Sequence, residues 1–268
     1  MRDTSRPVPF LASARAVFGL SLEGMLWSRR SLVLGAFLAI PVLIAIVYRL
    51  VLAARMPAEI TGLHLYGYLV ALFWVRNALP LAALFYATAL IADEVEGRTI
   101  TYLLTRPLSR GSILAGKFAA FLATTLSLSL PAAVVTFFLL ATSRGWAGMS
   151  ARVPDLFRDL GVMALTLLTY GAFFTLMGVL LRQPLIPGLL FVFLWELLAN
   201  APGYLPRFTI TAYLRSLIRH QPAQEGLAAL FGDVLPADLS LATLAAMIVV
   251  FLGAAAWIFW SREYVLDQ

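Results

Sequence analysis

The stretch LSLATLAAMIVVFLGAAAWIFWS, residues 239–261, decides the fold. It contains no Asp, Glu, Lys or Arg. A helix needs about 20 mostly apolar residues to cross about 30 Å of hydrocarbon. Because no water in the bilayer core can satisfy backbone N–H and C=O groups, such a segment must bond within itself, as a helix does. The stretch therefore predicts a transmembrane helix.

The composition of the whole chain agrees with this segment. Of the 268 residues, 61% are hydrophobic and only 13% are charged. A typical soluble domain is about half apolar and about a quarter charged. A globule of this size cannot bury so large a surplus of apolar side chains, because much of its surface stays exposed. We therefore predict an all-α integral membrane protein rather than a soluble enzyme.

Charge-free or nearly charge-free stretches recur along the chain and predict six transmembrane helices in all. Pro41, Pro80 and Pro131 lie inside them and predict kinks, which are tolerated where neighbouring groups satisfy the freed backbone. The second stretch contains Arg76, and the fifth, which is the shortest, contains Glu196. The predicted spans are residues 31–53, 67–91, 114–142, 159–181, 187–198 and 239–260.

Two segments outside the spans also carry a pattern. In residues 1–30, basic residues alternate with apolar and aromatic ones, which favours an amphipathic elbow helix lying in the membrane interface. In residues 199–238, Pro202, Gly203 and Pro206 break the chain before an apolar stretch. This outer segment predicts one or two short helices, re-entrant or interfacial, before the last span. The organisation is thus an elbow helix, residues 1–30, and a transmembrane domain, residues 31–268.

Several functional classes find no support in the sequence. The net charge is +6, but the basic residues stand singly or in pairs between apolar runs, unlike a nucleic-acid-binding face. The absence of cysteine removes disulfides and thiolate metal sites. His64 and His220 are too far apart for a recognisable metal motif, and neither H-E-x-x-H nor a Gly-flanked nucleophilic serine is present. We expect no catalytic, cofactor or metal site.

The loop between the second and third spans, residues 92–113, begins a polar stretch that reads ADEVEGRTITYLLTRPLSRGSILAGKFAAF over residues 92–121. Residues 99–104 predict a short helix between Gly97 and Pro107, since proline forbids its continuation. Ser109 or Ser112 is expected to cap the next helix. A short helix that is apolar on one side fits a groove of a soluble partner. Its apolar residues are Ile100, Leu103 and Leu104.

This segment resembles the coupling region of the type-2 permeases of ATP-binding cassette (ABC) transporters. The shared pattern is an acidic residue and Gly, a Thr, a Leu-rich turn, then Pro, an aliphatic residue, Ser and Arg, and finally Gly-Lys opening the third span. Arg98 departs from many relatives, which place Thr directly after Gly. The pattern is carried by Glu94, Glu96, Gly97, Thr99, Leu103, Leu104, Pro107, Leu108, Ser109, Arg110, Ile113, Gly116 and Lys117.

The resemblance implies a transmembrane permease subunit of an ABC transporter, most simply an exporter, whose coupling helix docks on a separate nucleotide-binding ATPase subunit. Because the chain has no G-x-x-x-x-G-K-[ST] motif, ATP and Mg²⁺ are expected on that partner and no cofactor on this chain. The implied docking residues are Glu94, Glu96, Gly97, Thr99, Leu103, Leu104, Pro107, Ser109 and Arg110.

The resemblance also implies a second permease chain, either another copy or a paralogue. It implies a multi-pass protein of the bacterial inner membrane with both termini cytoplasmic. Arg and Lys are somewhat more numerous in the segments that this orientation places inside, as the positive-inside rule requires.

Arg76 and Glu196 suggest an alternative. Charges inside a membrane are costly and often functional, so the two residues are candidates for the translocation path or for an ion pair across the bundle. Alternatively, each lies near a span end and reaches the headgroups. A secondary transporter that works alone would use them as coupling charges, but such transporters are built from internal repeats, and no convincing repeat is seen here.

Overall fold

The computed structural model describes residues 9–54, 61–90, 109–142, 152–181, 183–201, 203–218 and 235–261. All regular secondary structure in these ranges is helical. Five helical stretches within them are long and apolar enough to cross a membrane, which confirms the predicted all-helical membrane protein. These stretches are Arg29–Ala53, Gly62–Ala87, Arg110–Ala141, Val153–Leu180 and Ala237–Ser261.

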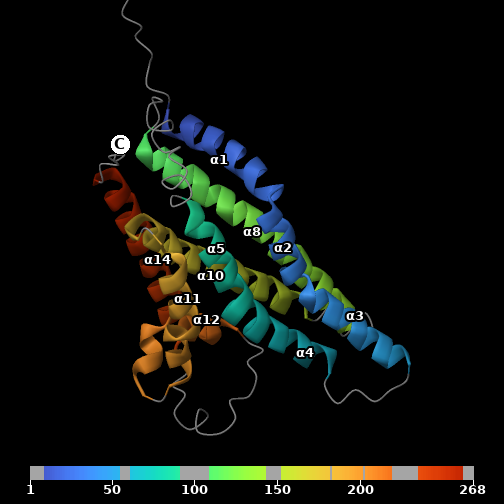
Figure 1. Cartoon of the computed structure of the whole chain (residues 1–268). Helices are drawn as coiled ribbons and strands as arrows, with labels where there is room; N and C mark the ends of the chain where they lie inside the picture. The colour runs from blue at the N-terminus through green and yellow to red at the C-terminus, as the bar shows by residue number, and fades with distance from the viewer. Residues whose placement is uncertain are drawn as a thin grey trace, which may run out of the picture.

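In the described part of the N-terminal segment, α1 (Phe10–Leu26) packs along α8 (Arg110–Ala141) at one end of the molecule (Figure 1). Its buried residues, Ser13 and Val17, lie one turn apart and form the contact face. Large apolar side chains elsewhere on the helix are exposed, among them Leu20. The structure thus describes a helix, Phe10–Leu26, within the predicted elbow segment, while the amphipathic elbow helix in the membrane interface stays a prediction.

The first span consists of two helices, α2 (Arg29–Leu38) and α3 (Ile40–Ala53). They meet at Ala39, which ends one helix and begins the other. Pro41 follows in the first turn of α3, where its missing N–H costs no internal hydrogen bond. The predicted kink is therefore a break between two helices.

The second span begins at residue 62, earlier than predicted. It is a continuous path through α4 (Gly62–Tyr68), the π-helix η1 (Leu69–Ala78) and α5 (Leu79–Ala87). Thr61 sets the start, because its hydroxyl accepts the N–H of His64 at 3.4 Å.

The fourth span, α10 (Val153–Leu180), also starts before its predicted beginning at residue 159. The additional residues bring Arg158 into the helix, directly before the buried Asp159. Arg158 is accommodated there because its Nε donates to the carbonyl of Leu217, 2.8 Å away.

The predicted fifth span, residues 187–198, is not a helix of spanning length. Its first part belongs to α11 (Leu185–Phe193), which falls well short of the length that a helix needs to cross the hydrocarbon core. A 3-10 helix, η3 (Trp195–Asn200), follows. The α-helix gives way to a 3-10 helix here because Trp195 and Glu196 are held by the outer segment. The Trp195 indole, for example, donates to the carbonyl of Phe208 at 3.1 Å.

The outer segment contains the short helices that the sequence predicts. They are the 3-10 helix η4 (Leu205–Phe208) and α12 (Ile210–Leu217). The last span, α14 (Ala237–Ser261), follows the prediction closely. Figure 1 shows α11 leading from the end of α10 to the opposite end of the bundle, where α12 lies and α14 begins.

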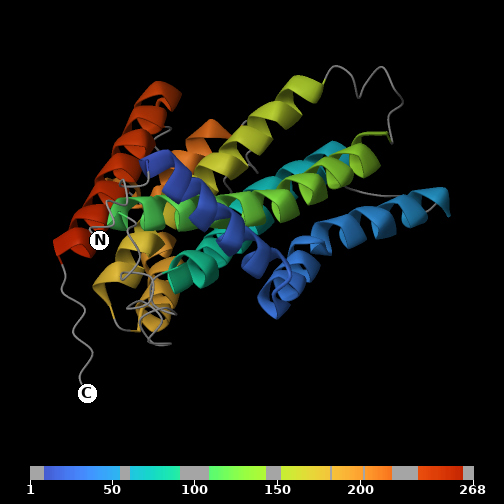
Figure 2. The same ribbon diagram turned by 90° about the horizontal axis from the view of Figure 1, so that it is seen from above.

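The helices form one bundle with α8, α10 and the α4–α5 path at its centre. In Figure 2, α14 lies at one flank and α2–α3 at the other. Leu38, Trp74, Phe121, Tyr170 and Phe174 are fully buried between these elements. The start of α1, the start of α8 and the end of α14 lie at the same end (Figure 1), which is also where α5 ends.

Candidate functional site

The predicted docking residues that the structure describes lie where α8 begins. Ser109 is the N-cap of α8, and its Oγ accepts the N–H of Ser112 at 3.2 Å. The structure thus decides between the two predicted caps. A cap of this kind satisfies one of the four unpaired N–H groups of a helix start and contributes about 1 kcal/mol.

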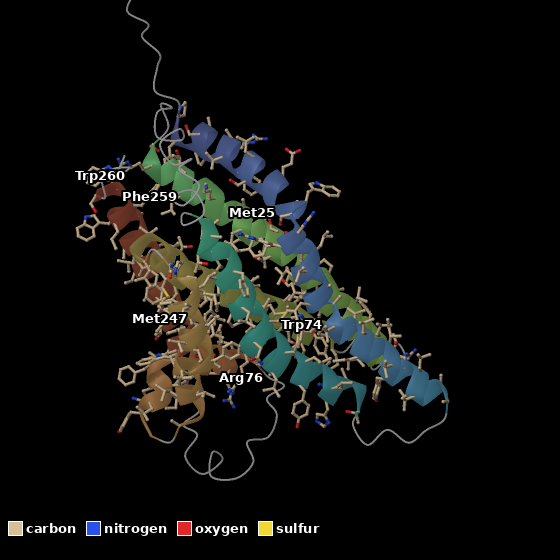
Figure 3. The ribbon with its side chains drawn as sticks, in the orientation of Figure 1. Met25, Trp74, Arg76, Met247, Phe259 and Trp260 are labelled. Atoms are coloured by element: carbon tan, nitrogen blue, oxygen red, sulfur yellow. The ribbon has the colours of Figure 1, made fainter. Side chains whose placement is uncertain are left out.

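Arg110 ties this helix start to the end of the chain's last span. Its Nη1 donates to the carbonyl oxygens of Phe259 at 3.3 Å and Trp260 at 2.9 Å. Those carbonyls belong to the last turn of α14, where intrahelical partners are lacking and the helix dipole favours a cation. Figure 3 shows Phe259 and Trp260 beside the start of α8. Arg110 therefore couples α8 to α14.

The Gly-Lys pair of the motif has a packing role. A Cβ on Gly116 would lie 2.6 Å from the carbonyl oxygen of Ala14 and 2.9 Å from the Cβ of Val17, so only glycine allows α1 to lie this close to α8. Lys117 is 7% exposed, and its Nζ donates to the carbonyl of Leu90 at 3.0 Å. The pair thus fixes α1 and the residues just after α5 against α8.

The other predicted docking residues lie outside the described residues. They belong to the connection between α5 and α8, and the described ends of these two helices lie at the end of the bundle along which α1 runs (Figure 1). The residues concerned are Glu94, Glu96, Gly97, Thr99, Leu103, Leu104 and Pro107.

Residues 111–117, GSILAGK, match the first seven positions of a phosphate-binding P-loop. Two observations exclude that function. Phe118 stands where the motif requires the Ser or Thr that binds Mg²⁺. In addition, the segment is part of α8, so its backbone N–H groups point along a helix rather than converge on a phosphate.

A second cluster of polar groups lies at the opposite end of the bundle, around α12. Glu196 is only 4% exposed, and its two carboxylate oxygens accept the backbone N–H groups of Ile210 at 3.2 Å and Thr211 at 3.1 Å. Thr209 adds a side-chain cap by accepting the N–H of Ala212 at 3.3 Å. A carboxylate at a helix N-terminus also interacts favourably with the helix dipole. Glu196 therefore anchors α12.

The other end of α12 is anchored by a positive charge. Arg158 of α10 donates to the carbonyl of Leu217, the last residue of the helix. Between the two ends, the Tyr170 hydroxyl is 2.9 Å from the Thr211 hydroxyl, and the Ser216 hydroxyl donates to Ser240 of α14 at 2.7 Å. The outer segment is thereby fixed to both α10 and α14.

The suggested ion pair between Arg76 and Glu196 is not formed, although both residues are described. The carboxylate of Glu196 is occupied by α12, and Arg76 lies in η1 with its side chain half-exposed. Figure 3 shows Arg76 toward the end of the bundle where α12 lies. Burial, and then the positive charge of Arg76, lower the pKa of Arg215 in α12. Arg76 is thus close to another cation.

Buried hydroxyl groups in α8 and α10 do not by themselves define a translocation path. Thr125, Ser129, Thr136, Thr166 and Thr169 each donate to a carbonyl one turn earlier in their own helix. This local bonding satisfies a hydroxyl in an apolar environment without a partner from elsewhere.

Two groups that organise this region, Arg158 and Tyr170, were not predicted from the sequence. Arg158 lies just before the predicted fourth span, because the prediction of that span rests on the charge-free run that follows it. Tyr170 is hidden in an apolar stretch, where a tyrosine resembles any other aromatic residue until its hydroxyl partner is known.

The comparison with protein-family models finds a match to a family described as "ABC-2 family transporter protein", over residues 20–198. The matched region is more than half of the chain and includes the connection between α5 and α8 that carries the motif. The comparison with curated proteins finds no match. Together with the five apolar helices of spanning length, the family match identifies a multi-pass membrane component of ABC transporters. The chain belongs to the ABC-2 family of transporter membrane proteins.

Proposed function

We propose that this chain is the permease subunit of an ABC exporter and that residues 94–110 dock on its ATPase subunit. The observation that carries the proposal is the family match, which extends through this segment. The helices on either side support it, since α5 ends and α8 begins at one end of the bundle, beside α1 (Figure 1). The exporter direction rests on the resemblance of the motif to type-2 permeases.

The contacts at this end suggest how motion would be transmitted. A displacement of the start of α8 would be transmitted to α14 through the hydrogen bonds of Arg110. It would also reach the residues after α5 through Lys117, and α1 through the close contact at Gly116. Closure of two ATPase subunits on ATP would move these helices as a unit. The bundles of two permease chains would then alternate between inward-open and outward-open arrangements.

The remaining features of the proposal also follow the family. The chain crosses the membrane six times, with α11 and η3 as a short fifth crossing, and both termini are cytoplasmic in the bacterial inner membrane. A second permease chain, identical or paralogous, completes the pore. The exposed apolar surfaces of α2–α3 and α14 offer faces for lipid and for that second chain. ATP and Mg²⁺ bind the partner subunit.

The alternative of a secondary transporter loses its main support. It requires Arg76 and Glu196 as charges that respond to a transported ion or substrate. The Glu196 carboxylate instead accepts two backbone N–H groups of α12, a structural role that holds it in place. Arg76 remains a candidate for the translocation path.

The proposed docking is tested by two substitutions in the segment. Glu96→Lys reverses a charge and Leu104→Asp places a charge on the apolar side of the predicted helix. Each is expected to reduce co-purification of the ATPase and ATP hydrolysis by the complex at least about 10-fold, the effect of losing one well-packed contact of about 1.4 kcal/mol. Membrane insertion of the chain is expected to stay unchanged.

Glu23→Lys is the matched control, because Glu23 is an exposed acidic residue on α1, outside the segment. It should leave both readouts near the wild-type level. Normal assembly and hydrolysis in the Glu96→Lys and Leu104→Asp complexes would show that the docking role is wrong.

A further inference from the structure

The second span is irregular at its centre, where the 10 residues of η1 (Leu69–Ala78) form a π-helix between α4 and α5. At its end, the N–H of Leu79 donates to the carbonyl of Trp74, five residues back, whereas an α-helix bonds four residues back. Long π-helices are rare, and π-turns are frequent at functional sites. The cause of this one lies in the residue that follows Leu79, which is Pro80.

Pro80 brings two hydrogen-bond registers of this segment close to each other in free energy. Since proline has no N–H, the π register leaves the Val75 carbonyl without the donor five residues on. The α register would leave the Arg76 carbonyl without the donor four residues on, and the proline ring would clash with that carbonyl. Each register therefore carries one unfilled backbone acceptor, so local side chains decide between them.

Two side chains of η1 act in opposite directions on this balance. The Asn77 Nδ2 donates to the carbonyl of Leu72 at 2.6 Å, five residues back, and so stabilises the π register. The Trp74 indole N–H is fully buried, and no residue that the structure describes accepts it. A buried donor without an acceptor destabilises the arrangement that contains it. The segment thus combines features that favour and oppose its π register.

The two halves of the span pack on different neighbours. The helix before η1, α4, packs on α8, and the helix after it, α5, packs on α10. Because a π-turn contains more residues than an α-turn, a change to the α register would lengthen the span and turn α4 relative to α5. Trp74 is buried and Arg76 is half-exposed, and Figure 3 shows them on different sides of the span, so the same rotation would move both.

We propose that η1 is a register switch, which converts between a π-helix and an α-helix and thereby turns Arg76 relative to α5 and α10. Pro80 and Asn77 set the populations of the two registers. Shifts of helix register take place in microseconds to milliseconds. The switch would give Arg76, the candidate residue of the translocation path, two positions within one span.

The test measures the length of the span in the purified full-length chain, which has no cysteine of its own. His64→Cys on α4 and Phe85→Cys on α5 carry spin labels at exposed positions on either side of η1. Double electron–electron resonance gives the distance between the labels, about 32 Å if a continuous α-helix joins them at about 1.5 Å per residue. The labelled chain without further substitution should show a shorter distance as its main population.

Pro80→Ala, added to the labelled chain, supplies an N–H and removes the clash. It should raise the ratio of the α to the π register at least about 10-fold, so that the longer distance becomes the main population. Asn77→Ala removes one hydrogen bond of the π register and should raise the same ratio about 5-fold. It serves as the second variant if thermal unfolding shows that Pro80→Ala is not folded.

Pro131→Ala is the matched control, because Pro131 is also inside a long helix but belongs to the α-helix α8. It should leave the distance distribution of the second span unchanged. The same distribution with and without Pro80→Ala and Asn77→Ala, or an equal shift in Pro131→Ala, would overturn the proposal. None of these results depends on the ATPase.

Discussion

Glu196 shows how backbone N–H groups can stabilise a carboxylate inside a membrane protein, since no counter-ion stands beside it among the described residues. An ionised carboxylate in a low-dielectric environment is costly unless it is hydrogen-bonded. Here the two oxygens of the carboxylate take up two N–H groups at the start of α12, which would otherwise lack acceptors. The carboxylate gains hydrogen-bond donors and the helix end gains acceptors, and these hydrogen bonds fix the outer segment.

Glu196→Ala should therefore destabilise the chain. It leaves the N–H groups of Ile210 and Thr211 buried without acceptors, at a cost of about 1–3 kcal/mol. Glu196→Gln should cost less, because one amide oxygen remains. The measurement is thermal unfolding of the purified chain followed by tryptophan fluorescence. Glu23→Ala, at an exposed position on α1, is the control and should unfold as the wild type does. An unfolding temperature of Glu196→Ala equal to that of the wild type would contradict the anchoring role.

The chemistry of individual residues was only partly predictable. The sequence marks Glu196 as exceptional, since it is a carboxylate in an apolar stretch, but it cannot show that the partner is the backbone 14 residues further on. Ser109 was one of two candidate caps, and only the backbone geometry distinguishes it from Ser112. Long-range hydrogen bonds to backbone leave no pattern in a sequence.

At the scale of elements, the contact between α1 and α8 depends on a missing side chain. Gly116 faces the backbone of α1, and helices in membranes commonly approach each other at small residues because lipid offers no hydrophobic drive to bring them together. The motif glycine is thereby explained by packing alone. Function depends on this contact if α1 moves together with α8.

Gly116→Ala should destabilise the chain, by about 1–3 kcal/mol, because the added Cβ would lie 2.6 Å from the carbonyl oxygen of Ala14, which cannot move independently of α1. Gly19→Ala is the matched control, since a Cβ there meets nothing within 4 Å. The free energy of unfolding of Gly19→Ala should instead rise by about 0.5–1 kcal/mol, because alanine has a better helix propensity than glycine. Thermal unfolding compares the two, and a Gly116→Ala chain as stable as Gly19→Ala would show that α1 is loosely packed.

Helices could be predicted from the sequence where a continuous stretch of residues is sufficient to determine them. Five long apolar runs form helices of spanning length, because length and hydrophobicity are sufficient for them. The second and fourth spans begin earlier than predicted, because a cap at Thr61 and a long-range contact of Arg158 determine where these helices start. The predicted fifth span is not a single helix of spanning length, because its apolar residues, from Leu185 onward, end in a 3-10 helix held by the outer segment.

At the scale of the whole molecule, the two ends of the bundle have different characters. One end holds α1, the end of α5, the start of α8 and the end of α14, joined by Arg110 and Lys117. The other holds α12, tied to α10 and α14. The first end is expected to meet the ATPase and the second to face the far side of the membrane.

The absence of cysteine makes this expectation directly testable, because any introduced cysteine is unique. Leu104→Cys carries a photo-cross-linker in the proposed docking segment, and Ala54→Cys carries one at the exposed end of α3, on the far side of the bundle. The measurement is the cross-link formed in membranes that contain the chain and its ATPase. We predict an adduct with the mass of the ATPase subunit from position 104 and none from position 54. An adduct from position 54, or none from position 104, would contradict the proposed docking.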